Sequence, residues 1–214
     1  MERMHLDAIR EEYGRGILRR RDLTEVPGAL FVRWLEEAIA AGVAEPTAMV
    51  VSTIGERGFP ESRVVLLKSF DGEGFVFYTG YRSQKGKALS AEPRAALLFF
   101  WPELQRQVRI TGVAEKVSRE ASEAYFRSRP VSSQLGALAS EQSAVIPSRA
   151  WLEKRYRDLE SQYAASDIPV PLHWGGYRVL PAEMEFWQGR ENRLHDRFRY
   201  TRHGLGWKAD RLSP

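Results

Sequence analysis

The stretch ESRVVLLKSF, residues 61–70, places a run of four aliphatic residues between two cations, Arg63 and Lys68. A short apolar run of this kind, bounded by polar residues, favours a β-strand. Strict alternation would put the two cations on opposite faces of that strand, because they are five positions apart. They can serve one ligand region if the strand bulges or if a site lies at a subunit boundary. The alternative is two exposed charges at the ends of a strand.

Four more runs of the same character predict a protein built mainly from strands. They are TAMVVSTI (47–54), GFVFYTG (74–80), RAALLFFW (94–101) and QRQVRITGVAEKV (105–117). The glycine-containing turns GERGFP and DGEG follow the first two strand runs, and short connections of this kind make antiparallel hairpins. Further strands are expected in WGGYRVLP, EMEFWQG and a hairpin from HDRFRYTR to WKADRL. About eight short strands with interspersed helices predict an α+β fold, mainly β, that forms one antiparallel barrel.

Helical patterns lie between the predicted strands. PGALFVRWLEEAIAAG, residues 27–42, has apolar side chains at helical spacing, with Pro27 suited to the first turn and Gly42 to the C-terminal end. Shorter helices are expected over 83–93, over 118–130 with Ser118 as N-cap, and from about Ser148 to Ala165. We expect an N-terminal arm over residues 1–26, with a short helix or ordered segment at 4–13, and a single domain over 27–214.

The composition narrows the class of protein. The chain has 214 residues, 43% of them hydrophobic, which is enough for one sizeable core. Lys and Arg exceed Asp and Glu by only 32 to 28, which argues against a nucleic-acid partner. The sequence has no cysteine, so disulfides, thiolate nucleophiles and iron–sulfur clusters are excluded. The four histidines form no HxH or HExxH pattern, and we expect no protein-bound metal.

The sequence shows no pattern of a secretory signal, a membrane span or a dinucleotide-binding motif. The segment MERMHLDAIREEYG at the start has no apolar core of a secretory signal, and the longest apolar runs are too short to span a bilayer. We therefore expect a cytoplasmic protein that makes no membrane contact. The sequence contains no GxGxxG motif, which argues against a Rossmann fold.

Polar side chains in two segments suggest a ligand. In QRQVRITG, Gln105, Gln107 and Arg109 would share one strand face, and glutamine amides can both donate to and accept from a heteroaromatic edge. An outward polar face is the commoner alternative. In YTGYRSQKGK, a helix is expected to start near Ser83, and its free N–H groups, with Lys85 beside them, would form a seat for phosphate.

The segment NRLHDRFRY, residues 192–200, carries a potentially cationic side chain at every second position: Arg193, His195, Arg197 and Arg199. In an extended chain these side chains would point to one face, roughly 7 Å apart. Like charges repel, so the row suggests an anionic or aromatic ligand. For His195 alone, a structural tie to Asp196 or to the backbone is the alternative.

Six motifs occur in order along nearly the whole chain, from about Arg10 to Pro214: RVVLLK, FYTGYRSQK, RQVR, AYFRSRP, SEQSAV and EFWQGRENRLHDR. Together they closely resemble the pyridoxine/pyridoxamine 5′-phosphate oxidase family. The resemblance implies a homodimer of FMN-binding split β-barrels, with one FMN in each of two clefts between the subunits. It implies that dioxygen oxidises pyridoxine 5′-phosphate or pyridoxamine 5′-phosphate to pyridoxal 5′-phosphate, a step of vitamin B6 metabolism. Hydrogen peroxide is the second product, and the amine also yields ammonia.

The resemblance assigns residues to FMN by motif. Arg63 would lie near the FMN phosphate, Lys85 would hold that phosphate, and Gln107 would meet the edge of the isoalloxazine ring. The full set from one chain is Arg63, Val64, Val65, Leu66, Leu67, Lys68, Tyr78, Thr79, Gln84, Lys85 and Gln107. The partner chain would complete the site with Gln142, Ser143, Trp187 and Arg197.

Substrate contacts follow from the same resemblance. The substrate phosphate would be held by Lys68, Tyr125, Arg129 and Ser133. Arg193 and His195 would flank the pyridine ring as the catalytic pair, with Leu194 between them. The arm residues Arg10, Glu11, Glu12 and Tyr13 would cover the active site.

One position departs from the family pattern. The family often has Ser-Arg-Lys where this chain has Ser83, Gln84 and Lys85. A neutral amide holds a phosphate more weakly than a charged donor does, so we expect FMN to bind less tightly. Arg82 is a candidate to compensate for the missing charge.

Three other functions remain open at this point. One is a flavin reductase of the same fold group, against which the RLHDR and AYFRSRP motifs argue. Another is a non-catalytic carrier of flavin or pyridoxal phosphate, which would bind its ligand but make no peroxide. A third is a basic nucleic-acid-binding barrel, which the net charge of +4 supports little.

Overall fold

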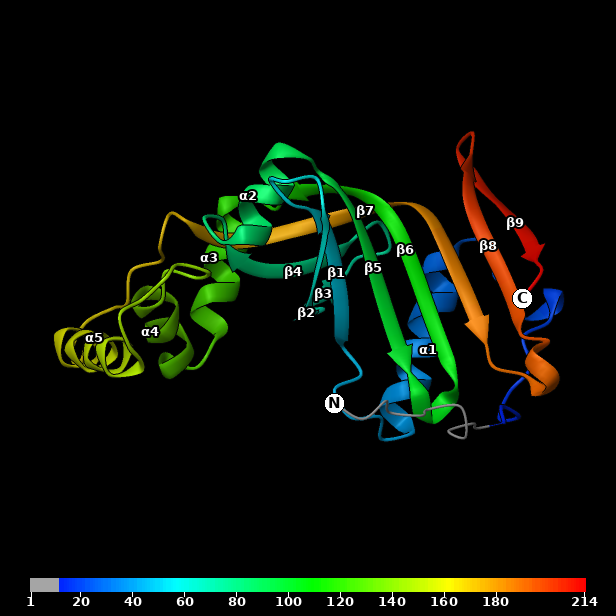
Figure 1. The fold of residues 1–214 in the computed structure, drawn as a ribbon, viewed down its shortest axis with the longest axis horizontal. Helices are drawn as coiled ribbons and strands as arrows, with labels where there is room; N and C mark the ends of the chain where they lie inside the picture. Colours follow the sequence, from blue (N-terminus) through cyan, green and yellow to red (C-terminus); the bar gives the residue numbers. More distant parts are fainter. Residues whose placement is uncertain (1–11) are drawn as a thin grey trace, which may run out of the picture. The chain divides into compact units, whose positions relative to one another are not determined.

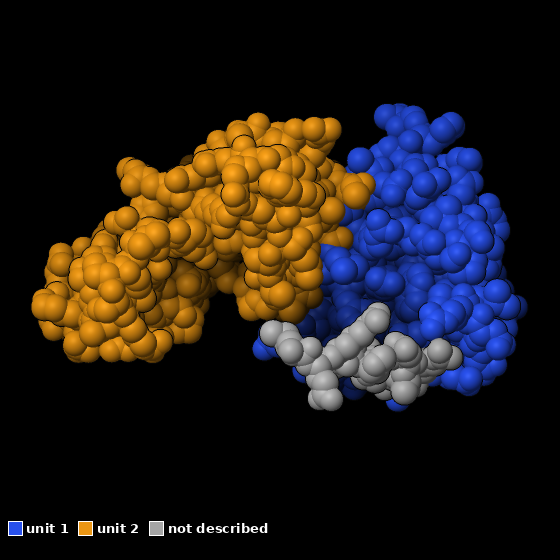
Figure 2. Space-filling model, viewed as in Figure 1, with its two compact units in different colours: residues 1–46, 98–110, 182–214 blue, residues 47–97, 111–181 orange. Residues whose placement is uncertain are grey.

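The computed structural model describes residues 12–214, so predictions for residues 1–11, including Arg10 and Glu11, lie outside the described part. The chain forms two compact units (Figure 2). Unit 1 comprises Met1–Pro46, described from residue 12, with Leu98–Ile110 and Ala182–Pro214. Unit 2 comprises Thr47–Leu97 and Thr111–Pro181. Three long strands contribute residues to both units.

Antiparallel strands dominate the structure, as predicted (Figure 1). Unit 2 contains residues from β1 (Ala48–Ile54), β2 (Pro60–Leu66), β3 (Ser69–Phe70), β4 (Phe75–Gly80), β5 (Arg94–Trp101), β6 (Arg106–Lys116) and β7 (Trp174–Gln188). The strand order is β2-β1-β5-β6-β7-β4-β3. The glycine turns make the predicted hairpins, in which Val51 pairs with Arg63 and Ser69 pairs with Val76.

The predicted strand over residues 61–70 is broken, which corrects that expectation. The Leu67 N–H donates to the Thr47 carbonyl beside β1, whereas the Lys68 N–H donates to the Val76 carbonyl in β4. The chain therefore changes its pairing partner between these two residues. Because β2 and β3 are the two ends of the strand order, this short link joins the edges of the sheet, and the sheet curls into a barrel.

Helices cover the ends of unit 2. They are α2 (Gln84–Ala91), α3 (Arg119–Ser128), α4 (Val131–Ala139) and α5 (Arg149–Gln162), with α4 and α5 side by side (Figure 1). Three serines cap helices as N-caps: the side chains of Ser83, Ser118 and Ser148 accept backbone N–H bonds. The sequence did not predict α4, because Pro130 reads as the end of the preceding helix and no polar cap follows it.

Unit 1 is built on α1 (Pro27–Ala40), which ends near Gly42 at φ +68°, as predicted. Trp34 packs edge-on against Phe186 of β7, with ring centroids 5.3 Å apart. β8 (Asp196–His203) pairs with β7 and with β9 (Gly206–Leu212), so the predicted C-terminal hairpin is confirmed. Residues 174–188 form one strand, β7, where the sequence suggested two.

Two predicted polar rows are confirmed only in part, since Gln107 and Arg109 do share one face of β6. Asn192 and Arg193 have φ near +57° and +59°, in a short helical turn, and β8 begins only at Asp196. The row of alternating cations is therefore reduced to Arg197 and Arg199 within β8. Gln105 also adopts a left-handed conformation, φ +54°, before β6 begins, so it does not extend a strand face with Gln107. Left-handed residues break the alternation on which both predictions depended.

Within residues 12–214, no helix has the length and apolar character needed to cross a membrane. The same residues contain no group of three or more His, Asp or Glu side chains arranged to hold a metal ion.

Candidate functional site

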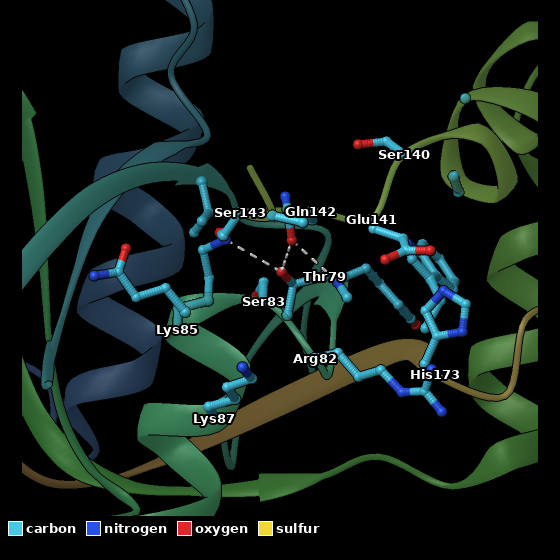
Figure 3. Close-up of a pocket in the computed structure, with 18 of the residues that line it drawn as sticks. Thr79, Arg82, Ser83, Lys85, Lys87, Ser140, Glu141, Gln142, Ser143 and His173 are labelled. Carbon is cyan, nitrogen blue, oxygen red and sulfur yellow. Dashed lines mark hydrogen bonds between the residues drawn. The ribbon is translucent and has the colours of Figure 1, made fainter. Parts of the chain in front are cut away.

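A pocket of about 1170 Å³ opens in unit 2, and most of the predicted ligand residues of this unit line it (Figure 3). Those residues are Val64, Val65, Leu66, Lys68, Tyr78, Thr79, Gln84, Lys85, Tyr125, Arg129, Ser133, Gln142 and Ser143. They come from β2, the link before β3, the end of β4, the start of α2, the α3–α4 region and the segment between α4 and α5. The break at Leu67 explains how Lys68 reaches the pocket although strict alternation opposed it.

Lys85 is buried at the start of α2, where Ser83 accepts the N–H of Gly86. The Lys85 Nζ donates to the Thr79 hydroxyl, 3.3 Å away, and that hydroxyl donates to Gln142 Oε1 at 2.7 Å (Figure 3). Burial, and then the charge of Arg63, lower the pKa of Lys85. No carboxylate pairs with Lys85 among residues 12–214. A buried ammonium without an acid partner suits an anionic ligand such as a phosphate.

Gln142 lies in the same chain as the Thr79 it contacts. Its Oε1 also accepts the N–H of Gly80 at 3.2 Å, and Ser143 follows it with φ +72°. The sequence analysis assigned Gln142 and Ser143 to the partner chain. Both residues line the pocket formed by their own chain, and their assignment to the FMN site of the partner chain stays a prediction.

Three stacked rings form one wall of the pocket. Tyr78 and Tyr125 stack with centroids 3.9 Å apart, and Trp174 lies 5.4 Å from Tyr78 at an interplanar angle of 14°. Burial raises the pKa of both tyrosines, so they remain neutral donors. The sequence analysis missed Trp174, because its position at the start of an apolar strand indicated only core packing.

Arg129 is another cation of the pocket with which no carboxylate pairs in the described part of the chain. Its guanidinium lies over Trp174, 5.0 Å from the ring centroid, and burial lowers its pKa. Its Nη1 is buried and makes no hydrogen bond within residues 12–214. Arg129 therefore presents an unused donor beside a pocket, where an anion would satisfy it.

Arg63 and Leu67 do not line the pocket, although the sequence analysis grouped them with it. Arg63 donates to Thr53 Oγ1 at 2.7 Å and pairs with Glu61 at 3.3 Å. Gln84 donates to the same Glu61 carboxylate at 2.9 Å. Arg63 thus acts on the pocket through its charge near Lys85.

Arg82 does not take the place of a cation at position 84. In Figure 3 its side chain extends toward His173, and Lys85 lies on the other side of Thr79. Gln84 therefore leaves the region of Lys85 with one positive charge fewer than the family pattern would give.

Unit 1 holds a second group of predicted residues. The rings of Tyr13, Trp187 and His195 contact one another and are here named the ring cluster. The ring centroid of Tyr13 lies 5.7 Å from that of Trp187 and 5.7 Å from that of His195, and the centroids of Trp187 and His195 are 4.6 Å apart. The backbone N–H of Arg190 donates to His195 Nδ1 at 3.1 Å. This is the structural hydrogen bond to the backbone that the sequence left open as an alternative for this histidine. Burial, then the charges of Arg193 and Arg197, lower the pKa of His195. A neutral imidazole that accepts at Nδ1 carries its proton on Nε2.

Two acidic residues, whose pairing with arginines was not predicted, hold the arginines around the ring cluster. Glu185 is buried and accepts from Arg197 at 2.8 Å and from Arg109 at 3.2 Å. Asp196 accepts from Arg190 at 3.1 Å and from Arg211 at 2.7 Å. Glu185 lies between the apolar residues Met184 and Phe186. A charged residue within an apolar strand could have indicated a buried ion pair.

The remaining predicted residues of unit 1 are less constrained. Leu194 is 69% exposed, Gln107 is partly buried on β6, and Glu12 is exposed. Arg193 pairs with no carboxylate within residues 12–214. Arg199, for which the sequence suggested no role, lies 3.8 Å from Glu183.

Comparison with known proteins agrees with this geometry. Residues 35–163 match the family described as pyridoxamine 5′-phosphate oxidase, and residues 174–214 match the pyridoxine 5′-phosphate oxidase C-terminal dimerisation region. A pyridoxine/pyridoxamine 5′-phosphate oxidase of Cronobacter sakazakii is 52% identical over 206 residues, 96% of this chain and 94% of that protein. One from Rubrobacter xylanophilus is 51% identical over 212 residues, 99% and 98% of the two chains.

A solved structure confirms the predicted fold class. PhzG from Burkholderia lata, in complex with tetrahydrophenazine-1-carboxylic acid, superposes with a TM-score of 0.87. It is 33% identical, and the match covers 92% of this chain and 98% of PhzG. The motifs, the fold and the nearly full-length identities agree: the chain belongs to the pyridoxine/pyridoxamine 5′-phosphate oxidase family.

Proposed function

We propose that the protein oxidises pyridoxine 5′-phosphate or pyridoxamine 5′-phosphate with dioxygen, using FMN. The alcohol gives pyridoxal 5′-phosphate and hydrogen peroxide. The amine consumes one water as well and releases ammonia. The observation that carries the proposal is one pocket that contains the buried Lys85 and the buried Nη1 of Arg129, neither paired with an acid within residues 12–214, beside a wall of stacked rings. Relatives that share about half of the sequence along its whole length carry this activity in their names.

The residues of the pocket fit FMN. Lys85, Thr79 and the start of α2 would hold its phosphate, since they offer a buried ammonium, a hydroxyl and helix N–H groups. When bound, FMN would accept two electrons from the substrate C4′ carbon and pass them to dioxygen. The missing charge at Gln84 makes this seat weaker than one with an arginine there.

Arg129 would anchor the substrate phosphate. Its free Nη1 supplies a charged donor, and Tyr125, Ser133 and Lys68 line the same pocket. An anchor distant from C4′ fixes the orientation of the pyridine ring without touching the reacting carbon. Arg193 and His195 would then act on that ring: Arg193 as a charge beside the reacting carbon, and His195 as a donor through Nε2.

The ring cluster would come from the partner subunit of a homodimer. Residues 174–214, which match a dimerisation region, include Trp187, Arg193, His195 and Arg197. A cytoplasmic location, and one split-barrel domain over 27–214 preceded by an arm, belong to the same proposal. Mixing inactive Lys85→Ala and Arg197→Ala proteins tests the shared site. Subunit exchange should restore about one quarter of wild-type activity, because only mixed dimers carry one intact site. No recovery after verified exchange would contradict a shared site.

The function itself is tested with purified protein, FMN and pyridoxine 5′-phosphate in air. Pyridoxal 5′-phosphate and hydrogen peroxide should form in equal amounts, and the protein should show flavin absorbance. Flavin binding without aldehyde would indicate a carrier instead. Oxidation of a reduced nicotinamide without turnover of the pyridoxine phosphate would indicate a flavin reductase.

A further inference from the structure

Gln105 combines two unusual properties in unit 1. It is a buried polar residue, 8% exposed, and it adopts a left-handed conformation with φ +54°. It stands between the short turn Pro102–Leu104 and the start of β6. A residue other than glycine persists in this conformation only where surrounding contacts hold it, and such residues concentrate at functional positions.

The side chain of Gln105 binds the segment that leads from the N-terminal arm. Its Oε1 accepts the N–H groups of Gly14 at 2.9 Å and of Arg15 at 3.0 Å, about 90 positions away along the chain. Its main-chain carbonyl accepts the N–H of Gly189 at 2.8 Å. One residue therefore ties the arm to the segment that follows β7.

Close packing shows that the arm is seated tightly at this point. A Cβ atom at Gly189 would lie 3.0 Å from the Cβ atoms of both Gln105 and Tyr13. A Cβ atom at Gly16 would lie 2.7 Å from Gln188 Oε1. At both positions a methyl group would press on side-chain atoms of the neighbouring residues, which would have to shift to admit it.

The contact ends at the ring cluster. Tyr13 directly precedes the two residues bound by Gln105, and its ring lies 5.7 Å from both Trp187 and His195. We propose that Gln105 is a positioning residue: by docking residues 14 and 15, it holds Tyr13 against His195 and so sets the affinity for the substrate. The kinetic part of this inference rests on the proposed function, whereas docking of the arm does not.

Docking is tested first without substrate. In Gln105→Gly the backbone conformation becomes easy while the side-chain acceptor is lost, so the variant should fold. Trypsin should cut the Arg15–Gly16 bond about tenfold faster than in the wild type, as expected from losing two ordinary hydrogen bonds. Gln105→Glu keeps an acceptor oxygen and should behave as the wild type does. Gln162→Ala, an exposed change at the end of α5, is the matched control. Equal cleavage rates in Gln105→Gly and the wild type, at equal thermal midpoints, would overturn docking.

Kinetics then test whether docking acts through Tyr13. Gln105→Gly should raise KM for pyridoxine 5′-phosphate about tenfold and leave kcat within about twofold. The double variant Tyr13→Ala/Gln105→Gly should have the same kcat/KM as Tyr13→Ala alone. Additive losses would overturn the positioning role. If the wild type formed no pyridoxal 5′-phosphate, the proposed function would fail, and the cleavage rates would still decide whether Gln105 docks the arm.

Discussion

The pocket of unit 2 and the ring cluster of unit 1 differ in whether their cationic side chains are paired with carboxylates. In the pocket, Lys85 is buried, Arg129 is partly buried with a buried Nη1 atom, and no carboxylate pairs with either within residues 12–214. Around the ring cluster, Arg197 and Arg190 each contact a mostly buried acid, Glu185 or Asp196. A buried charge without a partner costs stability unless a ligand neutralises it, whereas a paired arginine is held in one orientation. The pocket is suited to bind anions, and the cluster is suited to orient groups.

The largest expected effect comes from the unpaired cation of the pocket. Arg129→Met should lower kcat/KM for pyridoxine 5′-phosphate by roughly 10³-fold, because two charge-assisted hydrogen bonds to the phosphate are lost. The thermal midpoint of the ligand-free protein should not fall, since the variant removes a buried donor that makes no hydrogen bond within residues 12–214. Steady-state kinetics and calorimetry on the same samples make the measurement. A strongly destabilised variant would mean that Arg129 serves the fold.

Arg193 differs from Arg190 and Arg197 of the same region, because no carboxylate pairs with it among the described residues. Arg193→Ala should slow anaerobic flavin reduction at saturating substrate by roughly 100-fold, since a charge near the reacting carbon is removed. Lys68→Ala is the matched comparison, and it should raise the substrate concentration required while leaving the limiting rate nearly unchanged. Stopped-flow absorbance separates these effects. A normal limiting rate in Arg193→Ala would exclude the catalytic role.

Substitution of Glu185 tests whether a paired acid stabilises the region of the ring cluster. Glu185→Ala should lower the free energy of unfolding by about 2 kcal/mol, because Arg197 is left partly buried without its acid. Urea denaturation of wild type, Glu185→Ala and Glu185→Gln gives the series, and the glutamine variant should fall between the others. Unchanged stability in Glu185→Ala would show that this pair does not hold Arg197 in place.

The smallest effect concerns protonation of His195. Its pKa lies below 6.5 through burial and the charges of Arg193 and Arg197, so Arg193→Ala should raise that pKa toward 6.5. Because the folded protein binds this proton more weakly than the unfolded chain, stability should decrease as pH falls below 6.5 through the folded pKa. Titration of the His195 ring signals by NMR checks the first statement. A pKa that stays constant or falls in the variant would contradict it.

Local patterns predicted much of the fold. Alternating apolar runs gave the strands, and Ser118 and Pro27 marked the starts of helices. The break after Leu67 could not be predicted, because it depends on which distant carbonyls accept the N–H groups of Leu67 and Lys68. Contacts of this kind form only in the assembled sheet, so a short segment of sequence does not reveal them.

The residues of the candidate site were likewise predictable only in part. Residue types such as Lys85 and Arg129 could be found by motif, and the structure does bring them to one pocket. The ion pairs of Glu185 and Asp196 with arginines, and the left-handed turn at Asn192 and Arg193, were not predicted. They are fixed by tertiary contacts, which a regular alternation of side chains does not reveal.

The link between β2 and β3 fixes more than the closure of the sheet. Leu67 is the last residue whose N–H donates a hydrogen bond toward β1, and Lys68 is the first whose N–H donates toward β4. The two residues are adjacent, so the link contains no residue that is free of both hydrogen bonds. An inserted residue would force β3 to slip by one position against β4, which turns its side chains to the other face. Evolution of this chain can therefore vary the length of its glycine turns far more freely than the length of this link.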